Sequence, residues 1–215
     1  MNYELKYSRT VCVFDFDGTL TTRDTLLLFI RHVHGTMRFL LGFLLFSPLI
    51  IMMKMRLFPN WKAKEKVFSL FFRGMTHARF QEHGEAFARK EASRICNTPV
   101  IDILRRHLAN GDKVYIVSAS IEDWVRPFLP HWVGEEASKS ITFLCTQAEI
   151  SASGTLTGHF LTKNCYGPEK VSRLLQAEPD RASYFLYAYG DSNGDREMLT
   201  FADKGTNVKK NANNC

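Results

Sequence analysis

Residues 11–21 read VCVFDFDGTLT, an apolar run that predicts a buried strand over 11–16 and ends in two carboxylates, Asp15 and Asp17. Buried strands seldom end in two acids, because an unpaired charge in a low-dielectric setting is costly. Open α/β sheets place their chemistry at the carboxyl ends of their strands. Taken alone, the stretch also fits an Asp-Gly turn that closes a hairpin.

The chain beyond residue 97 alternates between strand and helix patterns. Strands are predicted at 113–120, 141–145 and 184–189, a hairpin at 149–161, and helices at 100–108, at 121–128 and from Pro168 onward. Strands separated by helices predict a parallel, doubly wound sheet with right-handed crossovers.

Residues 21–96 do not share this alternation and predict helices only. The expected helices are 26–33, stopped by Gly35, then 61–72 and 76–95, with the apolar run 39–53 between the first two. We therefore predict a catalytic core of residues 1–20 and 97–215, and a helical cap of residues 21–96 over the mouth of the sheet.

Charge is unevenly distributed along the chain. The net charge is +6, but residues 25–80 carry nine Lys/Arg against one acid, Glu65, which gives +8 there and −2 elsewhere. Such asymmetry predicts an anionic partner for this segment. Residues 39–53 hold no charge and lie between Arg38 and Lys54, which suits the interface of an anionic bilayer. A core helix of the cap and a dimer contact are the alternatives, and the run is shorter than the roughly 20 residues of a spanning helix.

Five scattered cysteines without a C-x-x-C spacing favour reduced thiols, and disfavour a disulfide framework or a zinc site. The N-terminal residues lead directly into the first predicted strand, so we expect no signal peptide. We expect a cytoplasmic protein, peripheral at the cytoplasmic face of the membrane.

Several polar residues follow strand ends or begin a helix: Asp15, Asp17, Ser118, Lys170, Asp191 and Asp195. Carboxylates that converge on one sheet edge repel one another and need cations. Lys170 supplies one, and Mg²⁺, which prefers oxygen ligands, is the natural second. A phosphomonoester would then be bound by the ion, by Lys170 and Ser118, and by backbone N–H groups in the turn after Asp15, at Phe16 and Gly18.

In this order and strand context, these residues resemble the four motifs of the haloacid dehalogenase superfamily. The resemblance implies a three-layer Rossmann-like core with a C1-type helical cap inserted after the first strand. It makes Asp15 the nucleophile that forms an aspartyl-phosphate, and Asp17 the general acid and base. Mg²⁺ would be held by the Asp15 and Asp191 carboxylates and the Asp17 main-chain carbonyl, with Asp195 acting through water or by orienting the other ligands.

Asp17 and the position of the predicted cap indicate which branch of the superfamily the chain resembles. An Asp at position 17 resembles the phosphatases of the superfamily, and a helical insertion between the first two motifs resembles its phosphoserine-phosphatase-like branch, subfamily IB. Residues 154–159 (GTLTGH) and 164–170 (NCYGPEK) look most like the phosphatidylglycerophosphatase C-like group. Asp24 stands where phosphoserine phosphatases have a Glu that contacts the substrate amine. With Asp24, the cap residues expected at the substrate are Lys62, Lys64 and Lys66.

The sequence thus predicts a Mg²⁺-dependent phosphomonoester hydrolase that acts on a phospholipid-type substrate such as phosphatidylglycerophosphate, at an anionic membrane surface. A soluble small-metabolite phosphatase is the first alternative. A non-catalytic, membrane-peripheral binding protein is the second, and the complete motif set argues against it. Nucleic acid is not an expected partner, because the basic segment adjoins a long apolar run and matches no nucleic-acid-binding motif.

Overall fold

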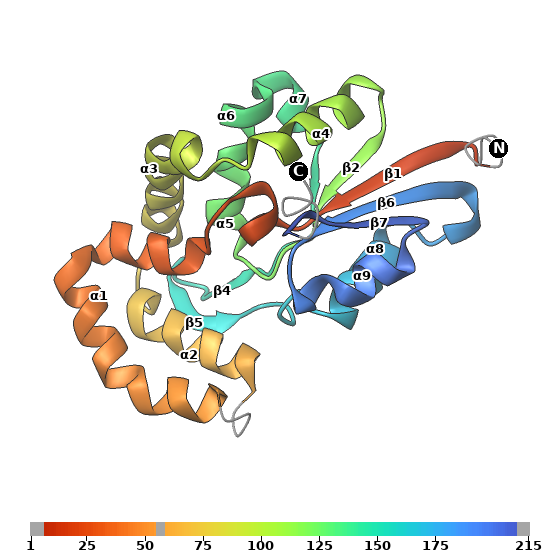
Figure 1. Ribbon diagram of the computed structural model, residues 1–215. Coiled ribbons are helices and arrows are strands. Elements are labelled where there is room, and N and C mark those ends of the chain that lie inside the picture. Colours follow the sequence, from red (N-terminus) through yellow and green to blue (C-terminus); the bar gives the residue numbers. More distant parts are fainter. Residues whose placement is uncertain (1–6, 55–58, 210–215) are drawn as a thin grey trace.

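The strand that precedes the two acids, β1 (Arg9–Phe14), is the central strand of a five-stranded sheet (Figure 1). A computed structural model describes residues 7–54 and 59–209, with the backbone alone for residues 46–54 and residue 60. The strands pair in parallel in the order β3-β2-β1-β6-β7. The α/β prediction is confirmed, and the hairpin alternative for the opening stretch is wrong. The other strands are β2 (Lys113–Ile116), β3 (Thr142–Phe143), β6 (Tyr184–Gly190) and β7 (Lys204–Asn207).

Helices cover both faces of this sheet. Successive side chains of Val11–Phe14 point to opposite faces and enter two separate apolar clusters, and all four residues are fully buried. Helices α8 (Pro168–Ala177) and α9 (Arg196–Phe201) contribute to one cluster, and α4 (Thr98–Ala109) contributes to the other. The result is the predicted three-layer core, with the carboxyl end of β1 opening at one edge.

Between β1 and α4, the described residues form three main helices, as predicted. These are α1 (Thr25–Lys54), α2 (Asn60–Phe72) and α3 (His77–Ile95), which lie to one side of the sheet (Figure 1). Helix α1 is interrupted at Gly35, whose φ of 75° favours a residue without a Cβ. Aromatic rings hold the helices together, with ring centroids 5.2–5.9 Å apart among Phe29, Phe68, Phe72, Phe80 and Phe87.

The predicted hairpin forms from β4 (Ala148–Ile150) and β5 (Leu156–Phe160), and it packs against a cap helix. The Phe160 ring lies 5.4 Å from that of Phe68 in α2, and the Phe160 N–H donates to Glu65 Oε1 at 3.0 Å. A part of the chain assigned to the core therefore supports the cap. The boundaries at residues 21 and 96 stay a prediction.

The region after β2 differs from the predicted single helix over 121–128. It contains α5 (Glu122–Val125), a 3₁₀ turn (Arg126–Phe128), α6 (Leu129–Val133) and α7 (Glu135–Lys139). Pro130 does not follow the helix but lies in the first turn of α6, where its missing N–H leaves no hydrogen bond unmade. Strand β2 also ends four residues earlier than predicted, so Ser118 lies in the following loop.

The apolar run 39–53 belongs to the part of α1 after Gly35. Among its described side chains, Leu44 and Leu45 are 72% and 71% exposed, whereas Phe39 packs against the core. The side chains of 46–53 lie outside the described residues. Over residues 7–54 and 59–209, no helix has the length and apolar character that crossing a membrane requires.

Candidate active site

The turn after β1 brings two strand ends close together. The Asp15 N–H donates to Tyr189 O at 2.9 Å and extends the β1–β6 pairing by one residue. Gly18 then adopts φ 76°, and a Cβ at this position would collide with the carboxylate of Asp191, which follows β6. A glycine is therefore required both by the backbone conformation and by this close approach.

Lys170, in the first turn of α8, joins two of the acids. Its Nζ donates to Asp15 Oδ1 and to Asp195 Oδ1, both at 2.6 Å, and all three residues are buried. Burial alone would lower the pKa of Lys170, but the two carboxylates outweigh it and the pKa is raised. Lys170 is therefore a permanent positive charge at this edge.

The pKa values of Asp15 and Asp195 shift in opposite directions at this edge. Burial raises the pKa of Asp15 to about 7, against the attraction of Lys170 and with repulsion from Asp195 and Asp17. Burial would also raise the pKa of Asp195, but Lys170 and hydrogen bonds from Ser192 hold it below its ordinary value. Asp195 Oδ2 accepts from Ser192 Oγ at 2.7 Å and from Ser192 N at 3.0 Å. Asp195 is thus fixed as a carboxylate, whereas Asp15 lies near its titration point at neutral pH.

Asp15, Asp191 and Asp195 form a group that fits a divalent cation. One ligand oxygen of each lies within 4.8 Å of the others, and three converging carboxylates are the donor set that Mg²⁺ prefers. The Asp191 side chain is 4% exposed and pairs with Lys209 Nζ. The Asp17 carboxylate is not in the group; its predicted metal contact is through the main-chain carbonyl and stays a prediction.

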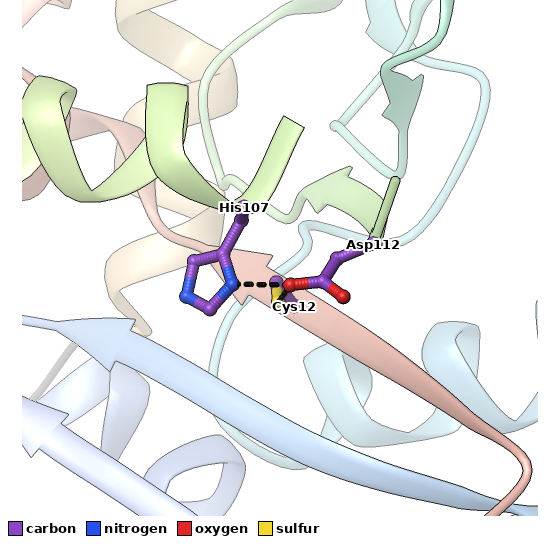
Figure 2. Close-up of side chains that lie close together, drawn as sticks. All are labelled: Cys12, His107 and Asp112. Carbon is purple, nitrogen blue, oxygen red and sulfur yellow. Dashed lines mark hydrogen bonds and ion pairs between the residues drawn. The ribbon is translucent and has the colours of Figure 1, made fainter. Parts of the chain in front are cut away.

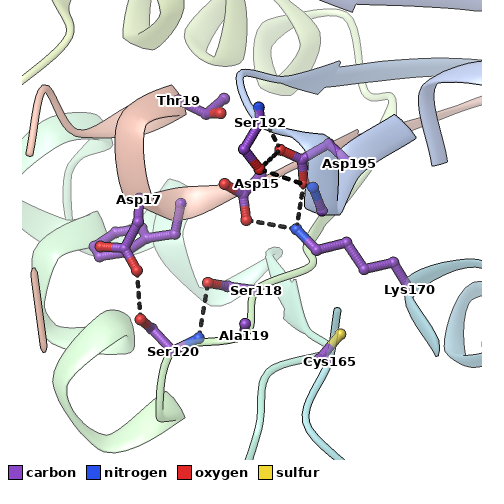
Figure 3. A network of polar contacts seen from close by, with 12 residues as sticks. Asp15, Asp17, Thr19, Ser118, Ala119, Ser120, Cys165, Lys170, Ser192 and Asp195 are labelled. Atoms are coloured by element: carbon purple, nitrogen blue, oxygen red, sulfur yellow. Dashed lines mark hydrogen bonds and ion pairs between the residues drawn. The ribbon is translucent and has the colours of Figure 1, made fainter. Parts of the chain in front are cut away.

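Asp17 is held separately, on the other side of Asp15 from Lys170 (Figure 3). Its Oδ1 accepts from Thr25 N at 2.8 Å and from Thr25 Oγ1 at 2.6 Å, and its Oδ2 accepts from Ser120 Oγ. Burial and then the Asp24 carboxylate raise the pKa of Asp17, while Lys64 and the hydrogen bonds from Ser120 and Thr25 oppose the rise.

A cavity of about 580 Å³ opens over these groups. Its floor is polar and includes the carboxylates, Ser118 and Lys170. Its wall on the cap side carries the charged Asp24 and Lys64 and an apolar part, which is formed by Leu26, Leu27, Phe43, Ala63 and Val67 from α1 and α2. The cavity therefore joins an anionic, lysine-bridged floor to a wall that is apolar in part.

A family model described as haloacid dehalogenase-like hydrolase matches residues 12–200. The chain belongs to this family. Protein CicA of Caulobacter vibrioides is 31% identical to this hydrolase-family chain over 207 residues, which cover 95% of the chain and 88% of CicA. The prediction of a hydrolase-family enzyme is confirmed.

Solved structures share the fold of this haloacid dehalogenase-like hydrolase. A protein of unknown function from Bordetella pertussis Tohama I has a TM-score of 0.75 at 20% identity, with 89% of this chain and 86% of that chain covered. A phospho-aspartyl intermediate analogue of phosphoserine phosphatase has a TM-score of 0.55 at 17% identity, with 90% and 83% covered.

Only one of the three predicted cap lysines of the hydrolase lines the cavity. Lys64 lines the cavity, and its Nζ donates to Ala119 O at 2.8 Å. Lys62 and Lys66 are exposed and do not line the cavity, and the Lys62 Nζ lies 5.4 Å from the Trp61 ring. Residues two apart on a helix point in different directions, so one lysine of this run enters while its neighbours do not. Asp24 lines the cavity and accepts from Leu26 N at 3.0 Å, at the start of α1.

The remaining predicted residues contribute in different ways. Ser118 is buried at the cavity floor, and its Oγ accepts from Ser120 N at 3.1 Å. The Phe16 side chain packs between Phe128 and Trp132, so only its backbone is suited to phosphate.

Sequence reasoning missed four residues at this edge: Thr25, Ser120, Ser192 and Lys209. Ser120 had a signal in the hydroxyl residues that end the predicted strand 113–120. Lys209 had none, because nothing local ties it to Asp191.

A second cluster of metal-ligand residue types, Cys12, His107 and Asp112, lies on the α4 face of the sheet (Figure 2). His107 Nδ1 contacts Asp112 Oδ2 at 2.7 Å, and His107 Nε2 contacts the Tyr189 hydroxyl at 2.9 Å. Burial raises the pKa of the Cys12 thiol far above its ordinary value. Both histidine nitrogens are engaged and the thiol is protonated, so we assign this cluster a structural role.

Proposed function

We propose that the chain is a Mg²⁺-dependent phosphomonoester hydrolase that works through an aspartyl-phosphate on Asp15. The observation that carries this proposal is the division of the acids. Asp15 lies against Lys170 within the metal-fitting group, while Asp17 is held apart by Thr25 and Ser120. Two carboxylates in different environments suit a nucleophile and a proton carrier.

The phosphoryl group would be bound on the cavity floor. Lys170 and the Ser118 hydroxyl would contact its oxygens, with backbone N–H groups in the turn Phe16–Gly18. When bound, Mg²⁺ on Asp15, Asp191 and Asp195 would neutralise charge on the transferring phosphoryl. Fixed donors at this edge would spread that charge without reorganisation, which is the main source of rate in such reactions.

Each half-reaction moves one proton through Asp17. First, an Asp15 oxygen bonds to phosphorus, the bond from phosphorus to the leaving oxygen breaks, and Asp17 gives its proton to that oxygen. Second, a water oxygen bonds to phosphorus, Asp17 takes a water proton, and the bond from phosphorus to Asp15 breaks. Inorganic phosphate leaves, and both acids return to their initial state.

The leaving-group end of the cavity supports a phospholipid-type substrate. Phe43, Leu27 and Val67 line it, and the α1 surface beyond Gly35 exposes Leu40, Leu41, Leu44 and Leu45 close by in the sequence. Apolar side chains in a segment that carries Arg31 and Arg38 suit an anionic bilayer surface. We therefore propose peripheral binding at the cytoplasmic face of the membrane, where the phosphate of a lipid would reach Asp15.

A small-metabolite phosphatase is the second candidate, and one observation favours it. Asp24 and Lys64 both line the cavity on the cap side, and such a charge pair suits a small zwitterionic leaving group. The fold shared with phosphoserine phosphatase agrees with this alternative without deciding it.

A substrate comparison tests both candidates. Mg²⁺-dependent phosphate release is measured from phosphatidylglycerophosphate, lysophosphatidate and phosphoserine, with Asp15→Asn as the inactive control. We expect the lipid substrates to have the larger kcat/KM. A preference for phosphoserine would favour the second candidate, and release that persists in Asp15→Asn would reject the assigned nucleophile.

A further inference from the structure

Ser120 has contacts that the proposed roles do not use. It is fully buried in the loop after β2, where its N–H donates to Ser118 Oγ at 3.1 Å and its Oγ donates to Asp17 Oδ2 (Figure 3). One residue thereby contacts both a phosphate-binding candidate and the proton carrier.

The two oxygens of Asp17 differ in what surrounds them. Oδ1 accepts two hydrogen bonds from Thr25, one from its N–H and one from its hydroxyl. The Thr25 hydroxyl in turn accepts from Trp124 Nε1 at 3.1 Å, which leaves its own proton directed at Asp17. An N–H can only donate, so a proton on Oδ1 would face donors. Oδ2 is therefore the oxygen that can carry the proton.

Ser120 is the described partner of that oxygen. A hydroxyl can donate to a carboxylate and can equally accept from a carboxylic acid by rotating its proton. The same contact therefore serves Asp17 before and after proton transfer, which a backbone N–H or a lysine could not do.

We propose that Ser120 is the positioning residue of the proton-transfer step, holding Asp17 Oδ2 toward the leaving oxygen in both forms of the acid. This inference rests on the proposed role of Asp17. Before the transfer, the Oδ2–H turns from Ser120 Oγ to the leaving oxygen, and the Ser120 hydroxyl rotates to donate to Oδ2. As the proton then passes to the leaving oxygen and the bond from that oxygen to phosphorus breaks, Ser120 keeps its own proton and goes on donating to Oδ2. Ser120 acts through Asp17 and needs no contact with the substrate.

The dependence of kcat/KM on the leaving group distinguishes this positioning role from a purely structural role. An alkyl phosphomonoester such as glycerol 2-phosphate needs a proton on its leaving oxygen, whereas p-nitrophenyl phosphate releases a stable anion. The kcat/KM value reports events up to formation of the aspartyl-phosphate, so it excludes the shared hydrolysis step. For Ser120→Ala we expect a loss of about ten- to a hundred-fold with the alkyl substrate, and less than about three-fold with the aryl substrate.

Three further variants make the comparison decisive. Ser192→Ala removes a matched serine that bonds to Asp195 on the metal side, and it should lower kcat/KM for both substrates by the same factor. Ser120→Cys keeps a weak donor of similar size and should give an intermediate selective loss; it carries the test if the alanine variant does not fold. Asp17→Asn sets the largest discrimination expected.

The outcomes separate the inference from the function on which it rests. If Asp17→Asn does not discriminate between the substrates, the proposed role of Asp17 fails. A second outcome is that Asp17→Asn discriminates between the substrates while the Ser120 variants lower kcat/KM equally for both, or for neither. In that case the inference about Ser120 is overturned and the phosphatase proposal stands.

Discussion

The carboxyl edge of the sheet and the α1 surface beyond Gly35 are built on opposite principles. At the sheet edge, buried charges such as Lys170 and Asp195 are held in hydrogen bonds by partners from several elements. On the α1 surface, the side chains of Leu44 and Leu45 are 72% and 71% exposed. The first arrangement holds charged groups in fixed positions, where they can stabilise charge that develops in a reaction. The second leaves apolar surface exposed, which is typical of a site that binds a membrane or another protein. We therefore propose that the reaction and the delivery of substrate depend on different regions of this chain, and the following variants test that separation.

The largest expected effect is at the sheet edge. Asp15→Asn should lower Mg²⁺-dependent phosphate release by about four orders of magnitude or more, because it removes the nucleophile. Binding to anionic vesicles should not change. Asp102→Asn, on the exposed face of α4, is the matched control and should keep full activity. Vesicle binding that fails together with activity would break the separation.

The raised pKa of Asp15 predicts a pH-dependent stability in the metal-free protein. A carboxyl group whose folded pKa is about 7 against an ordinary 3.8 favours folding while it is protonated, so stability is lost as the pH rises from about 4 through 7. Three units correspond to about 4 kcal/mol as an upper bound. Because pH 5 already lies above the ordinary value, only part of this is lost between pH 5 and pH 8. Relative to wild type, Asp15→Asn should therefore gain about 2–3 kcal/mol in free energy of unfolding at pH 8 compared with pH 5, measured by urea denaturation in chelator. An equal difference at both pH values would contradict this account.

Charged substitutions on the α1 surface should weaken binding to anionic vesicles without lowering the rate of phosphate release. Leu44→Asp with Leu45→Asp should weaken binding to anionic vesicles by at least about ten-fold, because two apolar side chains no longer gain from burial. Activity on a soluble aryl phosphate should stay within about two-fold. Leu161→Asp, exposed elsewhere on the molecule, is the control. Flotation at low salt measures the effect, and a double variant that floats like wild type would remove the proposed membrane surface.

The smallest expected effect falls where the two regions meet. Lys64→Met should lower kcat/KM by about ten-fold, because this lysine lines the cavity and acts on Asp17. Lys62→Met removes the same charge from the same helix outside the cavity and should change kcat/KM by less than about two-fold. Steady-state kinetics on one substrate compares them, and equal effects would mean that only the net charge of α2 matters.

The grouping of the acids at one edge of the sheet could be predicted because it follows from where the strands end and how they are ordered. Asp15, Ser118 and Asp191 each follow a strand, and parallel strands end at one edge, so their order along the chain was enough to bring them together. Helices at 61–72 and 76–95 followed from capping residues and apolar spacing, and they formed close to those bounds. The helix predicted to end before Pro130 was wrong because a proline that ends one helix also suits the start of another.

By itself, the sequence determined the α/β fold, the helices between β1 and α4, and which acids follow a strand, because strand and helix patterns depend on residues that are near one another in the chain. Only the tertiary structure decided which of Lys62, Lys64 and Lys66 enters the cavity, and that Ser120 and Thr25 hold Asp17. Those choices depend on how α1 and α2 are rotated against the loop after β2. That rotation is set by aromatic packing across elements distant in the sequence, which no local pattern encodes.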